Sequence, residues 1–150
     1  MKKIPVQFFY MLILAITACN REEIPQTEIS NGLIHARILL PDQEYGYYRG
    51  TRFDWSGVIS ELTYDGHTYF GQWFEEYSPT LHDAIMGPVE EFAPLSYDDA
   101  SPGQTFVKIG VGRLTRTSDS IYNRFGYYPI ADHGTWKVRT KPDEVIFTQE

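Results

Sequence analysis

The chain has one cysteine, a shortage of positive charge and no long apolar run, and each shortage excludes a class of protein. Among 150 residues, a single cysteine excludes an internal disulfide framework and a four-thiolate zinc site. The 20 acidic and 13 basic side chains give a net charge of −7, which argues against nucleic-acid binding because phosphate neutralisation needs clustered Lys and Arg. No apolar run is long enough for an ordinary spanning helix. The hydrophobic fraction of 42% excludes a disordered chain and, at this length, predicts one domain with a core.

The cysteine ends a segment with the layout of a cleaved secretory signal. Lys2 and Lys3 precede a mostly apolar stretch over residues 4–16, and small residues come directly before Cys19. This ending resembles the bacterial lipobox, in which a diacylglycerol is joined to the cysteine thiol before signal peptidase cuts in front of it. We therefore expect residues 1–18 to be removed and lipidated Cys19 to anchor the protein to the bacterial cell envelope, at the outer membrane. The alternative is an ordinary signal peptide that leaves a free thiol.

The segment that follows is polar. Residues 19–32 contain a proline and show no hydrophobic periodicity, so we expect a flexible tether. The folded domain is then expected over residues 33–150. The chain ends on a predicted strand, Glu144–Glu150, with no element after it to cover its edge, and this ending predicts an incomplete domain.

Short strands bounded by turn signals dominate the remainder and predict a mainly β fold, an antiparallel β-sandwich. The strongest hairpin pattern is Gly57–Tyr64 and His67–Phe74 around Asp65-Gly66, a pair that tolerates the positive φ angles of a tight turn. Helical turns are expected only at His82–Met86 and Val89–Phe92. The other predicted strands are Leu33–Leu40, one long strand at Thr105–Thr115, and a hairpin of Thr135–Arg139 with Val145–Thr148.

Aromatic residues are concentrated in one part of the chain, since residues 45–77 hold 11 of the 23. They could form a β core with cross-strand ring pairs. They could instead form a sugar-binding surface, where flat rings stack on a pyranose and nearby polar groups bind its hydroxyls. Strand alternation places Tyr69 and Trp73 on one face and Phe70 and Phe74 on the other, so some rings must face a second layer or a ligand.

A dense polar and aromatic stretch lies inside this region. Arg49 and Arg52 are followed by Asp54 and Trp55, and glycines bracket the group. The arginine fork suits vicinal hydroxyls, carboxylates or phosphates. The alternative is structural: Arg52 and Asp54 could form a surface pair that contributes little.

A second polar stretch offers acid–base groups. His82 is followed by Asp83, and Glu90 by Glu91, but adjacency alone does not make a catalytic dyad. A hydrogen-bonded structural histidine is the competing interpretation. The four histidines show no ligand spacing such as His-Glu-x-x-His, and there is no phosphate loop, dinucleotide fingerprint or nucleophile elbow. We therefore expect no metal and no cofactor.

Three long strings carry a family resemblance. Tyr47–Ile59, Gly66–Phe74 and His82–Phe92 resemble a group of bacterial proteins related to the aldose 1-epimerase, or galactose mutarotase-like, superfamily. The similarity runs from about Asn31 to the C-terminus. It implies a β-supersandwich of large twisted antiparallel sheets, and because members of the superfamily are much longer, it implies that this chain is the N-terminal half.

The superfamily interconverts the α and β anomers of a free sugar, using a carboxylate base and a histidine acid. The resemblance implies His82 as a catalytic candidate, while the base glutamate and a second histidine normally lie in the C-terminal half. The expected carbohydrate-binding residues are Arg49, Arg52, Asp54, Trp55, Trp73, Asp83 and Glu90. Epimerase-type activity is then expected only in a complete domain. The alternatives are a non-catalytic carbohydrate-binding lipoprotein of a polysaccharide-uptake system and a structural envelope domain.

Overall fold

The computed structural model describes residues 23–150, and within that range the fold is mainly β, with antiparallel sheets and no helix. The predicted signal segment and the lipidation site at Cys19 lie outside the described residues. Within residues 23–150 there is no helix that is long and apolar enough to cross a bilayer. The strands are β1 (Gln26–Ser30), β2 (Ile34–Leu39), β3 (Val58–Tyr64), β4 (His67–Tyr69), β5 (Thr105–Lys108), β6 (Gly112–Thr115), β7 (Ile130–Asp132), β8 (Trp136–Lys141) and β9 (Glu144–Gln149).

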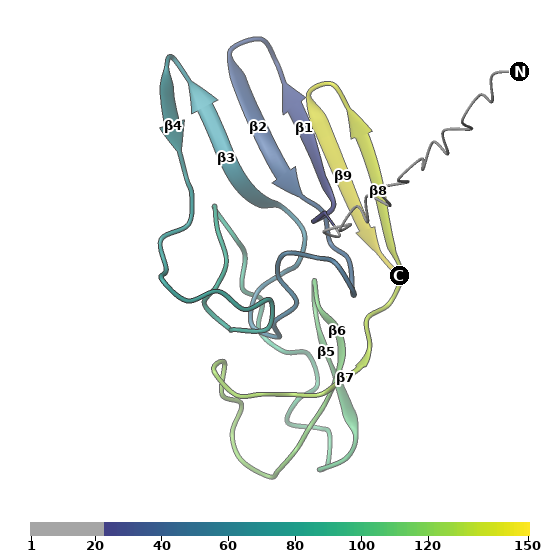
Figure 1. The fold of residues 1–150 in the computed structure, drawn as a ribbon. Coiled ribbons are helices and arrows are strands. Elements are labelled where there is room, and N and C mark those ends of the chain that lie inside the picture. The colour runs from purple at the N-terminus through teal and green to yellow at the C-terminus, as the bar shows by residue number, and fades with distance from the viewer. Residues whose placement is uncertain (1–22) are drawn as a thin grey trace, which may run out of the picture.

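The strands form three antiparallel sheets, ordered β1-β2-β3-β4, β5-β6-β7 and β8-β9. The four-stranded sheet and the β8–β9 hairpin lie together at one end of an elongated molecule, and the small β5-β6-β7 sheet lies at the other (Figure 1). The backbone N–H of Ser30 donates to the carbonyl of Pro142 over 2.7 Å, which ties β1 to the tip of the β8–β9 hairpin. Long irregular segments before β3 and between β4 and β5 fill the space between the two ends.

The four-stranded sheet has one apolar and one charged face. Ile29, Ala36 and Leu62 stand directly opposite one another on β1, β2 and β3, so their side chains share one face. On the other face, Arg37 pairs with Glu28 at 3.3 Å and with Glu61 at 3.7 Å. This alternation confirms the predicted strand at residues 33–40.

Both predicted hairpins are present. Asp65 and Gly66 have φ angles of 47° and 74°, which is the positive pair that a two-residue turn between β3 and β4 requires. The strand after the turn is shorter than predicted, since it ends at Tyr69. Phe70 has a φ of 64° and Gly71 a φ of 151°, and these angles turn the chain out of the sheet.

Three predictions from the sequence are wrong. Gln26–Ser30, placed in the flexible tether, is strand β1, in which half-buried residues alternate with exposed ones. Thr105–Thr115 is not one long strand but the hairpin β5–β6. Its turn contains Gly110, with a φ of 76°, where an added Cβ would clash with the carboxylate of Asp54. No helix forms at residues 82–92, where turns and bends alone are present.

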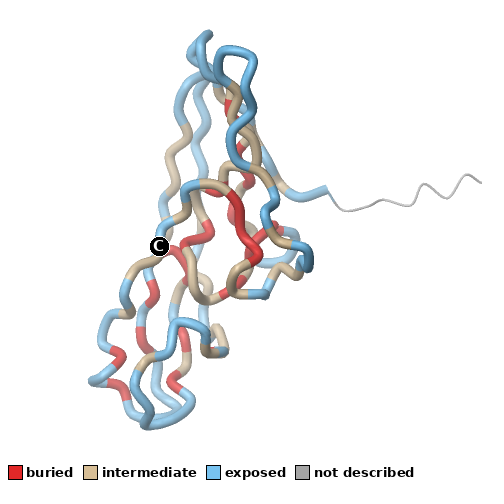
Figure 2. The backbone as a smooth tube through the Cα atoms, turned by 90° about the vertical axis from the view of Figure 1, so that its left-hand side faces the viewer, coloured by how far each residue is buried: buried red, intermediate tan, exposed pale blue. Residues whose placement is uncertain are grey.

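The hydrophobic core lies between the long loops and the sheets rather than within one sheet pair. Buried segments run through the middle of the molecule and into the β5–β6 end (Figure 2). Its largest fully buried side chains include Trp55, Phe106 and Leu114, each no more than 1% exposed. Of the eleven aromatic rings between residues 45 and 77, three belong to the core and two pack against it, while the other six are exposed.

Candidate functional site

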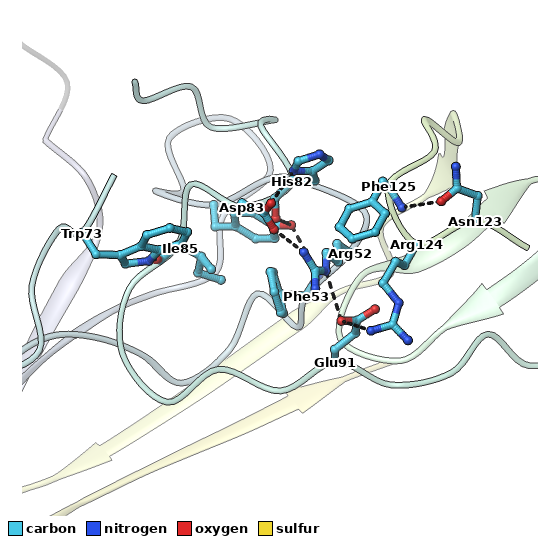
Figure 3. Close-up of polar contacts among 11 residues, drawn as sticks. Arg52, Phe53, Trp73, His82, Asp83, Ile85, Glu91, Asn123, Arg124 and Phe125 are labelled. Atoms are coloured by element: carbon cyan, nitrogen blue, oxygen red, sulfur yellow. Dashed lines mark hydrogen bonds and ion pairs between the residues drawn. The ribbon is translucent and has the colours of Figure 1, made fainter. Parts of the chain in front are cut away.

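Arg52 lies at the centre of a closed ion-pair network. Its Nε donates to Oε2 of Glu91 over 3.0 Å, and its Nη1 donates to Asp83. Its guanidinium also lies between two rings, 4.5 Å from the centre of Phe53 and 4.7 Å from that of Phe125 (Figure 3). The Arg52 side chain is only 15% exposed, and both faces and two edges of its guanidinium are in contact with other side chains. Arg52 therefore joins three loops, and few of its N–H groups remain free to bind a ligand.

His82 lies at the rim of this network. Its Nδ1 is 3.2 Å from Oδ2 of Asp83, yet this nitrogen makes no hydrogen bond, and its ring packs edge-on against Phe125 at 5.3 Å. Tyr48 donates its hydroxyl to the His82 carbonyl over 3.0 Å, which fixes the backbone at this point. The predicted catalytic histidine and the predicted ligand residue Asp83 thus come together with Arg52, in a cluster whose carboxylates are already neutralised.

Two residues expected to bind sugar are in the interior. Trp55 is 1% exposed, and its Nε1 donates to the carbonyl of Gly50 over 2.7 Å. Asp54 is 9% exposed, and its Oδ1 accepts the backbone N–H of Ser56 over 2.7 Å. Neither side chain presents an open surface to a ligand in this structure. Both hold the loop before β3 in shape.

Trp73 and Glu90 lie on the surface. The Trp73 ring is 70% exposed, although its Nε1 donates to the carbonyl of Ile85 over 2.9 Å and holds the ring in place. Trp73 lies on the opposite side of Ile85 and Asp83 from Phe125 and Arg124 (Figure 3). The backbone carbonyl of Glu90 accepts the N–H of Asp54 over 2.9 Å, while its side chain is exposed.

Arg49 is separated from the Arg52 network and lines a different hollow. This Arg49 hollow has a volume of about 280 Å³ and combines tyrosine rings, hydroxyl groups and a guanidinium. Arg52, His82 and Asp83 do not line it. Its lining consists of Gln43, Arg49, Gly50, Thr51, Thr80, Tyr127, Tyr128, Ile130 and His133.

The loop that carries Arg49 is firmly held. The backbone N–H of Arg49 donates to the carbonyl of Pro79 over 2.6 Å, and an added Cβ at Gly50 would clash with the Tyr48 ring. Beside it, the Tyr47 and Tyr77 rings stack at 4.7 Å, and Tyr77 donates its hydroxyl to the Tyr47 carbonyl over 2.6 Å. Burial raises the pKa of Tyr47 to about 12.

A second hollow adjoins the first. It has a volume of about 230 Å³ and shares Gln43 and His133 with the Arg49 hollow, while Trp136 lies only in the second. Nε of Arg49, Nδ1 of His133 and Nε1 of Trp136 are all buried and lack a hydrogen-bond partner. Buried polar groups are normally satisfied, so three unpaired nitrogens around two joined hollows are unusual.

Other parts of the surface have fewer groups that could bind a ligand. A further hollow, of about 520 Å³, is lined by residues between Ser96 and Thr105 and contains neither a ring nor a cation. Within residues 23–150 there is no group of three His, Cys, Asp or Glu residues placed to hold a metal ion.

No family model, curated protein or solved structure matches this chain. Its function is therefore argued from the Arg49 hollow and its surroundings.

The sequence pointed to Arg49 but missed its partners. Gln43, Tyr127 and Trp136 were not singled out, and His133 was considered only as a metal ligand. Tyr127-Tyr128 and the His133–Trp136 stretch are rich in side chains of binding type, but only the fold brings them to Arg49. Residue types along the sequence do not show that these side chains lie beside Arg49.

Proposed function

We propose that this chain is a lipid-anchored, carbohydrate-binding protein of the bacterial cell envelope, with one sugar unit bound in the Arg49 hollow. The observation that carries the proposal is the lining of that hollow. The ring of Tyr127, 78% exposed, offers an apolar face for stacking, while the Thr51 and Thr80 hydroxyls and the Arg49 guanidinium offer hydrogen bonds. Apolar walls with a few convergent polar groups are the usual anatomy of a small-molecule site.

The size of the hollow favours a single sugar unit. Its volume of about 280 Å³ is close to the lower end of the range for ligand pockets, about 300 Å³. Its backbone frame is set by the Arg49 to Pro79 hydrogen bond and by the close packing at Gly50, so little ordering is needed on binding.

The lining supports binding more than catalysis. Exchange of anomers needs one group that removes a proton and another that donates one. Among the described residues that line the hollow, His133 is an acid–base candidate, but there is no Asp or Glu. His82 lies outside the hollow, beside an Asp83 that is already paired with Arg52. Epimerase-type activity would need a carboxylate that the lining of this hollow does not supply.

A relationship to the galactose mutarotase-like superfamily is part of the proposal. The antiparallel β architecture and the partly uncovered apolar face of the four-stranded sheet support it. On that sheet Ile34 is 38%, Tyr64 48% and Tyr69 45% exposed, as expected for one layer of a sandwich whose second layer is incomplete.

One observation favours a second sugar-binding place. The exposed Trp73 ring is fixed by its hydrogen bond to Ile85, and a fixed flat ring suits stacking along an extended polysaccharide. This surface would take a chain rather than a single unit, since no described hollow includes Trp73 in its lining.

Calorimetric titration with monosaccharides tests the proposal. We expect saturable binding of at least one hexose or hexuronate, weakened about tenfold or more by Arg49→Met, because a hydrogen bond to a charged group contributes about 1.5–3 kcal/mol. Arg139→Met is the matched control, since Arg139 is exposed on β8 and the substitution changes the net charge equally. Absence of binding across a panel of hexoses and hexuronates would refute the proposal, and polarimetry of fresh α-galactose should show no acceleration of mutarotation.

A further inference from the structure

We infer that the ligand of the Arg49 hollow is an acidic sugar, and that its carboxylate binds the guanidinium of Arg49. The inference rests on the proposed function and narrows it from sugars in general to hexuronates. Its basis is a cation that has no carboxylate partner and that lines a hollow without Asp or Glu.

Arg49 lacks the carboxylate partner that four of the other described arginines have. Arg37, Arg52, Arg113 and Arg124 each pair with a carboxylate. Among the described ion pairs Arg49 has none, and its side chain makes one long hydrogen bond, from Nη1 to the Gln43 carbonyl over 3.5 Å. Its buried Nε has no partner at all.

The rest of the lining adds no negative charge. No Asp or Glu lines the Arg49 hollow. Asp42 lines the adjoining hollow, but its Oδ1 already accepts the N–H groups of Glu44 and Tyr45, over 2.8 and 2.6 Å.

A positive charge in a hollow without acidic side chains favours an anionic ligand. The chain as a whole carries a net charge of −7, so a guanidinium without a carboxylate partner is a local exception that attracts a negative group. The N–H groups of an arginine guanidinium form a planar fork that matches the two oxygens of a carboxylate. A neutral hexose would leave that fork with weaker acceptors, whereas a hexuronate supplies a carboxylate together with ring hydroxyls.

The lining of the hollow gives such a ligand a direction. With the carboxylate at Arg49, the ring hydroxyls face the other polar side chains of the lining, Thr51 and Thr80 among them. Tyr127 at the rim stays free to cover its apolar face.

The test compares galacturonate, galactose and inorganic phosphate by calorimetry at one pH and ionic strength. We expect galacturonate to bind at least tenfold more tightly than galactose, and Arg49→Met to remove the difference while Arg139→Met preserves it. Because the wild-type comparison needs no variant, a failure of Arg49→Met to fold leaves the test intact.

The other outcomes overturn the inference in distinguishable ways. If galactose binds as tightly as galacturonate, the acidic preference is wrong and the proposed function stands. If phosphate binds as tightly as galacturonate, the hollow is an anion site that does not recognise sugar, and both are wrong. If nothing binds, both are wrong as well.

Discussion

The guanidinium of Arg52 lies against the ring of Phe125, with 4.7 Å between the guanidinium carbon and the ring centre. The contact joins the loop before β3 to the segment between β6 and β7, which are far apart in sequence. The same guanidinium pairs with Glu91, so one side chain holds three irregular segments together (Figure 3). Arg52 was expected to bind a ligand, and its surroundings instead make it a structural cross-link.

The cross-link predicts a stability loss for Arg52→Met. Removing the cation leaves Glu91, only 18% exposed, without its closest partner, and we expect a cost of roughly 2–4 kcal/mol in the free energy of unfolding. Urea unfolding followed by circular dichroism measures it. Arg124→Met is the control, because Arg124 is 57% exposed and 3.5 Å from Glu91 and should cost less than about 1 kcal/mol. Equal losses in the two variants would contradict the account.

Replacing the two tryptophans predicted to bind sugar should reduce the stability of the protein by very different amounts. Trp55→Ala should destabilise the protein by about 3–5 kcal/mol, because it empties a site that is 1% exposed. Trp73→Ala removes a ring that is 70% exposed and should cost about 1 kcal/mol, mainly from its hydrogen bond to Ile85. Thermal denaturation of both variants is the measurement, and comparable losses would contradict the placement of Trp55 in the core.

Alkaline pH should destabilise the fold through Tyr48. Burial raises the pKa of Tyr48 from 10.0 to about 12, so between these values the unfolded chain has lost a phenolic proton that the folded chain still holds. Stability due to this group is present below pH 10 and is lost as the pH rises toward 12. We expect wild type to lose on the order of 2 kcal/mol more than Tyr48→Phe over this range.

Urea midpoints at pH 8, 10 and 11.5 check this prediction. Tyr47 and Tyr122 also have pKa values raised to about 12, and Lys108 has a lowered one, but all three are common to both proteins. The comparison therefore isolates Tyr48. Parallel pH profiles for the two proteins would show that its hydroxyl titrates normally.

The anchor proposal depends on Cys19. Cys19→Ser should move the protein from the membrane fraction to the soluble fraction, because acyl chains contribute about 0.8 kcal/mol per buried methylene. Fractionation of cells that express each form, with labelled palmitate incorporation as a second readout, makes the comparison. Membrane association that persists in Cys19→Ser without label would rule out the anchor.

Local patterns in the sequence predicted most strands, because alternation and turn residues act over a few positions. The Asp65-Gly66 hairpin and the β8–β9 hairpin are both formed. The errors arose where a distant contact decides the conformation. Gln26–Ser30 becomes a strand because β2 offers it a partner, and Gly110 turns where Asp54 packs against it.

The candidate site was predicted in part for the same reason. Arg49 was identified from its residue type, and it does line a hollow. Arg52, three residues later, has the same chemistry but is closed off by Asp83 and Glu91. Only the fold separates the two arginines and brings His133 and Trp136 to the first of them.

The most direct test of the central claim is the indole N–H spectrum of the three tryptophans, titrated with galactose and with galacturonate. Trp136 lies in the hollow that adjoins Arg49, Trp55 is buried with its ring 5.2 Å from that of His133, and Trp73 lies away from both hollows. We expect the Trp136 signal to shift most, the Trp55 signal to shift slightly and the Trp73 signal to stay in place. A shift confined to Trp73, or no shift at all, would contradict sugar binding in the Arg49 hollow.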